Sequence, residues 1–464
     1  MEAINNFFGT LSGWLWGLPL IVLVVGSGII LSLVTGFIVY RKFGFVLKNT
    51  FGKMFHKTAA DEAGITPFQA VSTALASTVG TGNIVGVATA IAGGGPGAVF
   101  WMWLAAIFGM STKFAEVTLS VAYREKNELG EYVGGPMYYL KNGLGMDWLG
   151  KIFALFAALA AFGIGSMVQS QSIASAMNSQ FSIPTWVTGA VIAVLAAIIL
   201  IGGIKRIGQV TEKLVPFMAA FYIVGGLLIL ILNAASVPAA IGAIFSNAFT
   251  GTAAFGGFAG ATVAQAIRYG VARGVFTNEA GLGSAPIAHA AATTDHPIRQ
   301  GIWGAFEVFV DTILVCTITA LVLISMGTWH HEALEGGART IEAFNMGLPG
   351  IGWIIVTMAL ILFPFTTIIG WCYYGEKSAE YLTNSSKIIT PYRALFIIVA
   401  FVGALGKVDV VWNFADVMNA LMAVPNLIGV LLLSGVVAKL AQQFFADPDK
   451  IYQPEDYAHI LKRK

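Results

Sequence analysis

Two clusters of glycine and polar residues interrupt long apolar stretches of the sequence, VGTGN at 79–83 and FTNEAGLG at 276–283. Each glycine weakens a helix by about 1 kcal/mol, so a helix that runs through either cluster is expected to break there. A break frees backbone N–H and C=O groups, which can bind the two charged ends of a small zwitterion, or a cation such as sodium. For a single cluster, close helix packing through Gly82 and Gly86 explains the glycines equally well.

The sequence gives no support for an enzyme. Residues 80–86 (GTGNIVG) resemble a dinucleotide-binding loop, but no β-branched strand precedes them, and residues 100–103 (FWMW) lie where an acidic residue is required about 20 positions downstream. Hydrolase motifs of the HExxH or GxSxG type are absent. We therefore expect no catalytic residues and no cofactor.

The composition indicates which elements must carry the two clusters. The chain has 464 residues, of which 57% are hydrophobic and only 11% are charged, against about 25% charged in soluble domains. Apolar runs of about 20 residues, long enough to cross a bilayer, recur throughout. A net charge of +2 with dispersed basic residues argues against a nucleic-acid partner, and Cys316 and Cys372 lie in apolar segments and indicate no disulfide. The sequence predicts an all-α polytopic membrane protein whose main partner is the lipid bilayer.

We expect eleven transmembrane helices. The first, at about Leu18–Tyr40, is interpreted as a retained span because no basic residue precedes it and no cleavage site follows it. The other ten are expected at about Pro67–Ala92, Ala98–Tyr123, Trp148–Met177, Pro184–Gly202, Thr211–Leu232, Gly260–Ala291, Gln300–Met326, Gly350–Tyr381, Pro391–Leu405 and Val410–Phe444. The expected domains are an N-terminal helix with a cytoplasmic linker (1–60), a ten-helix transporter core (61–445) and a cytoplasmic tail (446–464).

The distribution of basic residues supports this count and sets the orientation. Loops on one side contain 20 of the 26 lysines and arginines, whereas the opposite loops contain only Arg339 and Lys407. The protein is therefore expected in the cell membrane with its N-terminus outside and its C-terminus in the cytoplasm. Ten core spans form two sets of five, and an odd number per set inverts the second set. Because the clusters fall in the first span of each set, discontinuous helices around a site are favoured over simple packing.

Ionisable residues inside the spans are costly, so they are candidates for function. Lys113 and Glu116 are three positions apart and are expected to pair with each other on one helix face. Glu307 and Asp311 are four positions apart and either line a cytoplasmic ion path or pair with Arg299; the sequence does not choose between these roles.

The sixth core span contains three more charged residues. Arg268 and Arg273 lie in its external half, where they either close an outer gate against an acidic group or form structural pairs. Glu279 lies in the break and is expected to cap free backbone amides or to bond to Arg273 rather than to touch a substrate.

Residues 94–103 (GGPGAVFWMW), followed by Gly109, resemble the signature of the alanine or glycine:cation symporter family. Residues 77–84 and 276–281 resemble the same family, and the likeness covers nearly the whole chain. The resemblance implies the ten-helix inverted-repeat fold of the amino acid-polyamine-organocation superfamily. It also implies import of small neutral amino acids, with sodium as the coupling ion. Residues 79–83 further resemble the first-helix break of neurotransmitter:sodium symporters, which share this fold.

The resemblance places the substrate between the two breaks. Amides of the first break would hold its carboxylate, and free carbonyls of the second would hold its ammonium group. Phe276 and Trp371 could wall the apolar side of the pocket, although for each of them alone plain packing is the favoured role. The substrate-binding candidates are Thr78, Gly80, Thr81, Gly82, Asn83, Gln169, Phe276, Thr277, Asn278 and Trp371.

By analogy with the shared fold, one sodium ion would lie between the carbonyls of Ala76 and Val79 and the hydroxyls of Thr366 and Thr367. The alternative for the threonines is hydrogen bonding back to their own helix. Residue chemistry alone separates neither alanine from glycine nor sodium from proton coupling, so a proton-coupled or exchange-type amino acid transporter of the same fold is the alternative function.

Overall fold

The computed structural model describes residues 2–54, 60–250, 262–331, 333–406 and 408–462. Residues 55–59 of the predicted linker, the predicted start of the sixth core span at Gly260, and Lys407 lie outside these ranges. The described chain is nearly all helical, and its one sheet is a two-stranded antiparallel hairpin of β1 (Glu125–Lys126) and β2 (Tyr132–Val133).

The N-terminal span is longer than expected and bent. It consists of α1 (Glu2–Leu15) and α2 (Leu18–Val34), which meet at 46°. Pro19, which lacks an N–H, lies in the first turn of α2, and left-handed backbone at Gly36 and Phe37 follows the end of this helix. The predicted end at Tyr40 is therefore wrong, and short helices take up the linker: α3 (Ile38–Arg41), α4 (Phe43–Asn49) and η1 (Phe51–Lys53).

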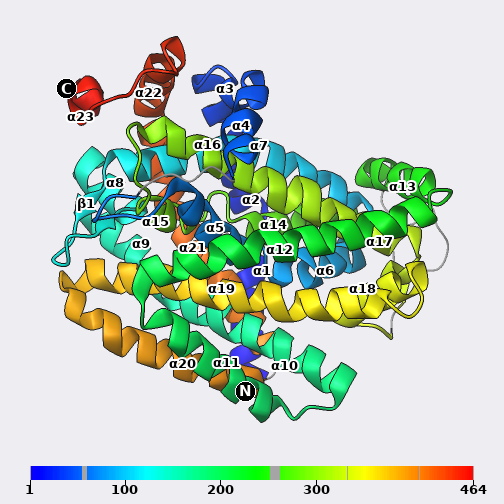
Figure 1. Ribbon diagram of the computed structural model, residues 1–464. Helices are drawn as coiled ribbons and strands as arrows, with labels where there is room; N and C mark the ends of the chain where they lie inside the picture. The colour runs from blue at the N-terminus through cyan, green and yellow to red at the C-terminus, as the bar shows by residue number, and fades with distance from the viewer. Residues whose placement is uncertain (1, 55–59, 251–261, 332, 407, 463–464) are drawn as a thin grey trace.

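The first five core spans follow the predicted order (Figure 1). They are the broken span α5 (Pro67–Thr78), η2 (Thr81–Asn83) and α6 (Val85–Gly94); then α7 (Gly97–Ala122); then α9 (Asp147–Ala160) with the π-helical η3 (Ala161–Met167) and α10 (Val168–Phe181); then α11 (Thr185–Leu200) and α12 (Gly203–Leu232). The short α8 (Pro136–Leu144) lies between the hairpin and α9.

The second five repeat the plan. They are the broken span α14 (Val263–Asn278) and α15 (Ala285–His289); then α16 (Pro297–Val308) with the π-helical η5 (Phe309–Cys316) and α17 (Thr317–Ser325); then α19 (Gly352–Thr383), α20 (Ile389–Leu405) and α21 (Val408–Leu432). Short helices connect or follow them: η6 (Thr328–His330), α18 (Gly336–Gly347), η7 (Ser386–Ile388), α22 (Ser434–Ala446) and α23 (Pro454–Leu461).

The helix lengths are consistent with eleven spans. Seven helices of the described chain are long and apolar enough to cross a membrane, and the bent N-terminal pair makes eight. The two broken spans and the 16-residue α11 are each too short in one piece to meet that length, and they account for the other three. Two further boundaries were wrong: α12 begins at Gly203, and the last span ends at Leu432, where a separate helix follows.

The sequence did not predict α13 (Val237–Thr250), which lies between the fifth and sixth core spans. It packs against α7, where Trp101 Nε1 donates to the carbonyl of Ala248 at 3.1 Å. A Cβ at Gly97 would lie 2.4 Å from the backbone of Asn247, so only glycine permits this approach.

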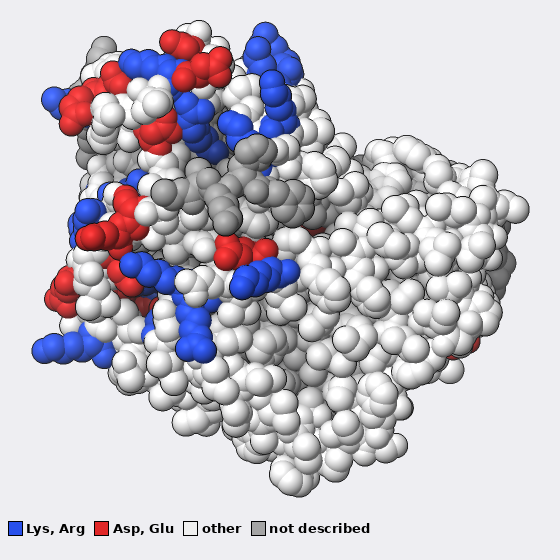
Figure 2. All heavy atoms as spheres, in the orientation of Figure 1, with Lys and Arg blue, Asp and Glu red and all other residues white. Residues whose placement is uncertain are grey.

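Charged side chains gather at one end of the molecule. Figure 2 shows lysine, arginine, aspartate and glutamate at the upper left of the view, over the end where Figure 1 places α22, α23, α3, α4 and β1. The side that carries α13, α18 and the end of α10 is almost free of them in this view. Large apolar side chains are exposed on α11, α12 and α20, as expected of surfaces that face lipid.

Candidate functional site

The first break is a complete interruption of a buried helix. Helix α5 starts with a capping box between Thr66 and Gln69 and ends at Thr78, after which Gly80 is extended and a single 3₁₀ turn follows. The side chain of Asn83 closes this turn, because its Oδ1 accepts from the Gly80 amide at 2.9 Å. The span is therefore broken at the glycine cluster, as the sequence predicted.

The second break is wider. Helix α14 ends at Asn278, and Glu279 takes a left-handed conformation with φ 56°. Gly281 and Gly283 follow with φ of 95° and 78°, values that side chains other than glycine rarely adopt. The chain resumes as a helix at Ala285.

Glu279 bonds to two side chains around this second break, and not to the free backbone amides that the sequence predicted as its partners. Its Oε2 accepts from Ser284 Oγ at 2.6 Å, and its Oε1 accepts from Trp371 Nε1 at 2.7 Å. It does not bond to Arg273, whose guanidinium instead pairs with Asp416 at 2.7 and 3.2 Å.

The two breaks touch each other. A Cβ at Gly82 would lie 2.9 Å from the Cβ of Thr277, so the backbones meet where any larger residue would separate them. All the residues of the first break are buried, and Thr277 is 1% exposed.

Gln169 on α10 binds the first break directly. Its Oε1 accepts from the backbone N–H of Thr81 at 3.3 Å and from the Thr81 hydroxyl at 3.1 Å. Its Nε2 donates to the carbonyl of Ile164 in η3, which fixes the orientation of the amide. Gln169 Oε1 therefore already accepts from the Thr81 backbone amide, which the resemblance assigned to the substrate carboxylate.

The four residues predicted to bind sodium are only partly brought together. Thr367 Oγ1 donates to the carbonyl of Ala76 at 3.1 Å, so α19 meets the end of α5 at this point. Val79 is fully buried at the break. Thr366 faces α12 instead, with its Oγ1 3.6 Å from Met218 Sδ. Both hydroxyls also donate to the carbonyl of Phe363 in their own helix, at 2.9 and 3.0 Å.

The remaining candidates surround the breaks. Phe276 stacks on Trp412 with ring centroids 5.0 Å apart, and Arg273 lies over both rings. Trp371 is fully buried and packs closely on η3. A Cβ added at Gly165 of η3 would lie only 2.1 Å from the Cβ of Trp371.

The two polar candidates nearest the ends of the broken helices are engaged locally. Both polar atoms of the Asn278 side chain have partners. Its Oδ1 accepts from the Ala280 N–H at 2.9 Å, and its Nδ2 donates to Thr312 Oγ1 at 3.0 Å. The Thr78 hydroxyl bonds back to Ala74 in its own helix at 3.2 Å.

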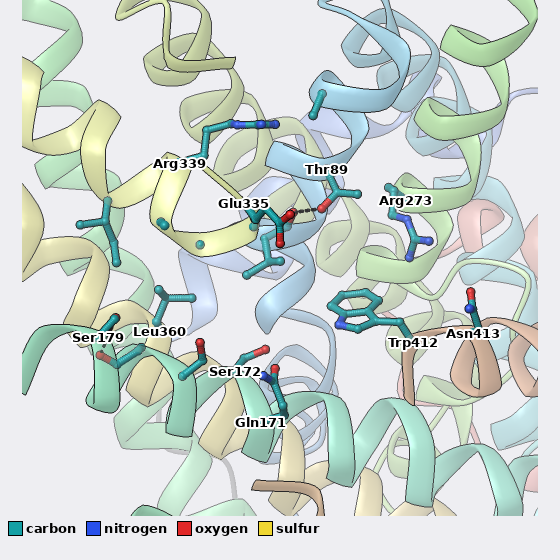
Figure 3. A pocket seen from close by; sticks show the side chains of 18 of the residues that line it. Thr89, Gln171, Ser172, Ser179, Arg273, Glu335, Arg339, Leu360, Trp412 and Asn413 are labelled. Atoms are coloured by element: carbon teal, nitrogen blue, oxygen red, sulfur yellow. Dashed lines mark hydrogen bonds between the residues drawn. The ribbon is translucent and has the colours of Figure 1, made fainter. Parts of the chain in front are cut away.

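A cavity of about 990 Å³ lies beside these residues (Figure 3). Polar side chains from several helices line it, including Thr89 of α6, Ser172 of α10, Glu335 next to α18, and Arg273 of α14. Trp412 also lines it and carries the stacking contact to Phe276. The cavity is thus connected to Phe276, near the end of α14, through one aromatic pair, and the Arg273–Asp416 ion pair lies in its wall.

Charged groups inside the spans have partners that the sequence did not predict. Lys113 pairs with Glu307 at 3.5 Å rather than with Glu116, and Glu307 also contacts His289 Nε2 at 3.0 Å. The expected Lys113–Glu116 pair was wrong because α16 packs against α7 and offers a carboxylate across the interface.

Two further carboxylates lie at the second break. Glu116 Oε1 accepts from the amide of Gly281 at 3.0 Å, and Asp311 accepts from Asn83 and Thr277. Arg299, the alternative partner of Asp311, pairs with Asp295 at 2.7 Å. Both acids lie inside predicted spans, where a charged side chain is costly. Their partners come from other helices, which the sequence did not specify.

Residues 1–458 match the family model described as "Sodium:alanine symporter family". The chain belongs to this family. It is 50% identical over 446 residues to the sodium/alanine symporter AgcS of Methanococcus maripaludis, covering 95% of this chain and 97% of that protein. It is 38% identical to YrbD of Bacillus subtilis, named as a sodium/proton-dependent alanine carrier, covering 92% and 90% of the two chains.

Among solved structures, the chain is similar to MhsT in complex with L-phenylalanine, with a TM-score of 0.59 at 12% identity, covering 86% of this chain and 96% of that one. At this identity the likeness shows the fold alone. The symporter-family chain is therefore an all-α, multi-pass membrane transporter built as an inverted repeat with two discontinuous helices, and it is not an enzyme.

Proposed function

We propose that the protein imports alanine and glycine by symport with sodium across the cell membrane, through alternating access. The observation that carries this proposal is the contact between the two breaks at Gly82 and Thr277, which brings the backbones of the two broken helices together in the buried centre of the protein. A zwitterion that binds there meets helix N-terminal amides on one side and helix C-terminal carbonyls on the other, so both of its charges are matched without a buried ion pair.

The substrate carboxylate would bind the amides of Thr81, Gly82 and Asn83 and take over the acceptor role that Gln169 now has at Thr81. Its ammonium group would bind carbonyls freed at the end of α14, near Phe276 and Thr277. The candidate set is completed by Thr78, Gly80, Asn278 and Trp371, which line or brace the same breaks.

Sodium would bind between the carbonyls of Ala76 and Val79 and the hydroxyls of Thr367 and Thr366. Thr367 is already adjacent to Ala76, whereas Thr366 would have to turn away from Met218. One sodium ion entering down about 100 mV and a tenfold gradient releases about 3.7 kcal/mol, enough to concentrate a neutral substrate about 500-fold.

The proposed orientation has the N-terminus outside and the C-terminus in the cytoplasm. It is supported by the charged end of the molecule, which carries α22 and α23 (Figure 2). On this orientation the 990 Å³ cavity opens to the outside, and residues 1–60, 61–445 and 446–464 form the N-terminal helix and linker, the transporter core and the cytoplasmic tail.

Uptake of labelled alanine and glycine into proteoliposomes tests this function, with sodium and proton gradients imposed separately. We expect an inward sodium gradient alone to drive accumulation. The Gly82→Leu protein should remain folded and fail to bind alanine, because its side chain would separate the two breaks. Accumulation driven by a proton gradient without sodium would instead support proton coupling, which the name of YrbD makes the main alternative.

A further inference from the structure

A buried cluster of charged and polar side chains lies apart from the residues proposed to bind substrate and sodium. It consists of Lys113 of α7, His289 of α15, and Gln300 and Glu307 of α16, each of which is 0% exposed. Ionisable groups inside a membrane span are costly, so a cluster of this kind is a candidate for function.

The hydrogen bonds of His289 fix its neutral form. Gln300 Nε2 donates to His289 Nδ1 at 2.8 Å, so this ring nitrogen carries no proton. The proton of the neutral ring is therefore on Nε2, which donates to Glu307 Oε2 at 3.0 Å. The other oxygen of Glu307 accepts from Lys113 Nζ at 3.5 Å.

Gln300 connects this cluster to the first broken span. Its Nε2 also donates to the carbonyl of Pro67, the first residue of α5, at 3.5 Å. Its Oε1 is buried and has no hydrogen-bond partner among the described residues. A half-turn of the amide exchanges the two atoms, so that Oε1 can accept from a proton on His289 Nδ1. Both N–H groups of an imidazolium would then have an acceptor, Glu307 on one side and Gln300 on the other.

Gln300 also lines a cavity of about 280 Å³, together with Phe45 of α4 and Phe444 of α22. Helices α4 and α22 belong to the charged end of the molecule (Figures 1 and 2). The cavity therefore lies between this end of the protein and the buried histidine.

The charges around His289 are able to balance an added proton. Helix α15 packs against α5, α7, α16 and α19, and α5 has no ionisable residue. The ionisable groups that the other elements bring near the histidine are Glu307 of α16, Lys113 and Glu116 of α7, Arg124 after α7, and Tyr374 of α19. Within the buried cluster one ammonium thus faces two carboxylates, so a cation at His289 has a counter-charge.

We propose that His289 is a proton-binding site filled from this cavity, and that Gln300 transmits its occupancy to the start of α5. When His289 binds a second proton, the Gln300 amide turns and its contact with Pro67 is lost. Helix α5 leads directly to the first break, so protonation favours movement of this half-helix away from α16. Only the identification of the cavity side with the cytoplasm rests on the orientation proposed above.

NMR of ¹³C-labelled histidine in the purified, full-length protein tests the site without relying on transport. The chain has six histidines, and the signal of His289 is the one that His289→Gln removes. We expect this signal to move from the neutral to the imidazolium position between about pH 8 and pH 5.5. A His289 signal that stays neutral over the whole range in which the protein is folded overturns the proposal.

Hydrogen exchange tests the link to α5, after correction for the intrinsic exchange rate. Exchange in the first turns of α5 should rise at least threefold at the lower pH relative to α7. In His289→Gln it should stay low at both pH values. In Gln300→Met, which keeps the side-chain length but cannot bond to Pro67, it should be high at both.

His296→Gln is the matched control, because His296 is a second buried histidine whose ring contacts the C-terminal helices instead. It should leave the response of α5 to pH intact. A response of α5 that survives in His289→Gln overturns the proposal. Neither measurement uses alanine or sodium, so a failure of sodium-driven uptake would refute the proposed function and not this site.

Discussion

Single residues determine how closely the parts of the site approach. Gly82 lets the two breaks touch, and Gly80 has a similar role toward α19, because a Cβ there would lie 2.6 Å from Thr367 Oγ1. The adjacent threonines of α19 consequently have different roles. Thr367 reaches the end of α5, whereas Thr366 points to Met218 on α12, since successive residues of a helix project about 100° apart.

The two threonines should therefore respond differently to removal of the hydroxyl. Thr367→Val keeps the branched shape but removes a neutral oxygen next to Ala76, so we expect the sodium concentration for half-maximal alanine binding to rise at least tenfold. Alanine affinity at saturating sodium should change much less. Thr366→Val should shift the sodium curve by a smaller factor, because the Thr366 hydroxyl faces Met218 and must turn before it can reach the ion. Sodium titrations of alanine binding decide this, and coincident curves for Thr367→Val and the wild type would remove Thr367 from the ion site.

At the scale of elements, the two π-helical segments deliver side chains to the breaks. Segment η3 precedes Gln169 in the third core span, and η5 contains Asp311 in the seventh. A π-helical turn inserts an extra residue and rotates the face of the helix that follows, and such turns are frequent at functional sites. Helix α19 contacts both η3 and the second break, because its Trp371 packs on Gly165 of η3 and donates to Glu279.

Replacing Trp371 should affect both stability and specificity. Trp371→Ala removes a fully buried side chain, which is expected to cost about 3–5 kcal/mol, and leaves Glu279 without its indole donor. If Trp371 also walls the substrate pocket, the variant should bind alanine more weakly and admit valine and leucine. Competition binding across these amino acids is the measurement.

Trp303→Ala provides the control for a general loss of packing, because Trp303 is also buried but lies on α16 away from the breaks. A competition profile for Trp371→Ala that matches those of the wild type and of Trp303→Ala would leave Trp371 with a packing role only.

At the scale of the whole molecule, the first break separates two cavities. The larger one is lined by Val85 and Thr89, which follow the break, and a smaller one of about 280 Å³ is lined by Pro67 and Phe68, which precede it. Phe444 of α22 also lines the smaller cavity, so the C-terminal helices cover this end of the core. An arrangement with a buried site between two opposed cavities suits alternating access.

Docking of the C-terminal helices should depend on pH through His296. Its ring contacts Phe444, Tyr452 and Tyr457 with centroids 4.6–5.2 Å apart, and its Nδ1 accepts from the Ile298 amide. Burial lowers the pKa of His296 to about 4, against an ordinary value of about 6.5. The nearby carboxylates of Asp295 and Asp456 act to raise this pKa, and the Arg299 guanidinium acts to lower it. Its neutral form is therefore favoured in the docked state, and this stabilisation is complete above about pH 6.5 and is lost as the pH falls toward 4.

Hydrogen exchange measured at pH 7.5 and pH 5 checks this, after correction for the intrinsic exchange rate. Exchange in α23 should rise at pH 5 relative to the core spans, and His296→Gln should reduce that difference. The control is His459→Gln, which removes the histidine of α23 itself and should leave the response to pH intact. Equal protection of α23 at both pH values would show that His296 does not control docking.

The sequence by itself determined the class of fold, the positions of both breaks and the family. Those features depend on local chemistry: long apolar runs cross a bilayer, and glycine-rich clusters cannot continue a buried helix. It also predicted Gln169 and Thr367 as site residues, but through the resemblance rather than through spacing, and the structure places both next to the first break.

Only the tertiary structure decided which groups meet. Lys113 pairs with Glu307 and not with Glu116, Thr366 turns away from the break, and Asp311 joins the two breaks. Each of these contacts links residues far apart in the sequence, and helical periodicity gives the face of one helix but not the neighbour that packs against it. The partner of a buried charge is fixed by that packing, so it becomes visible only when the spans are assembled.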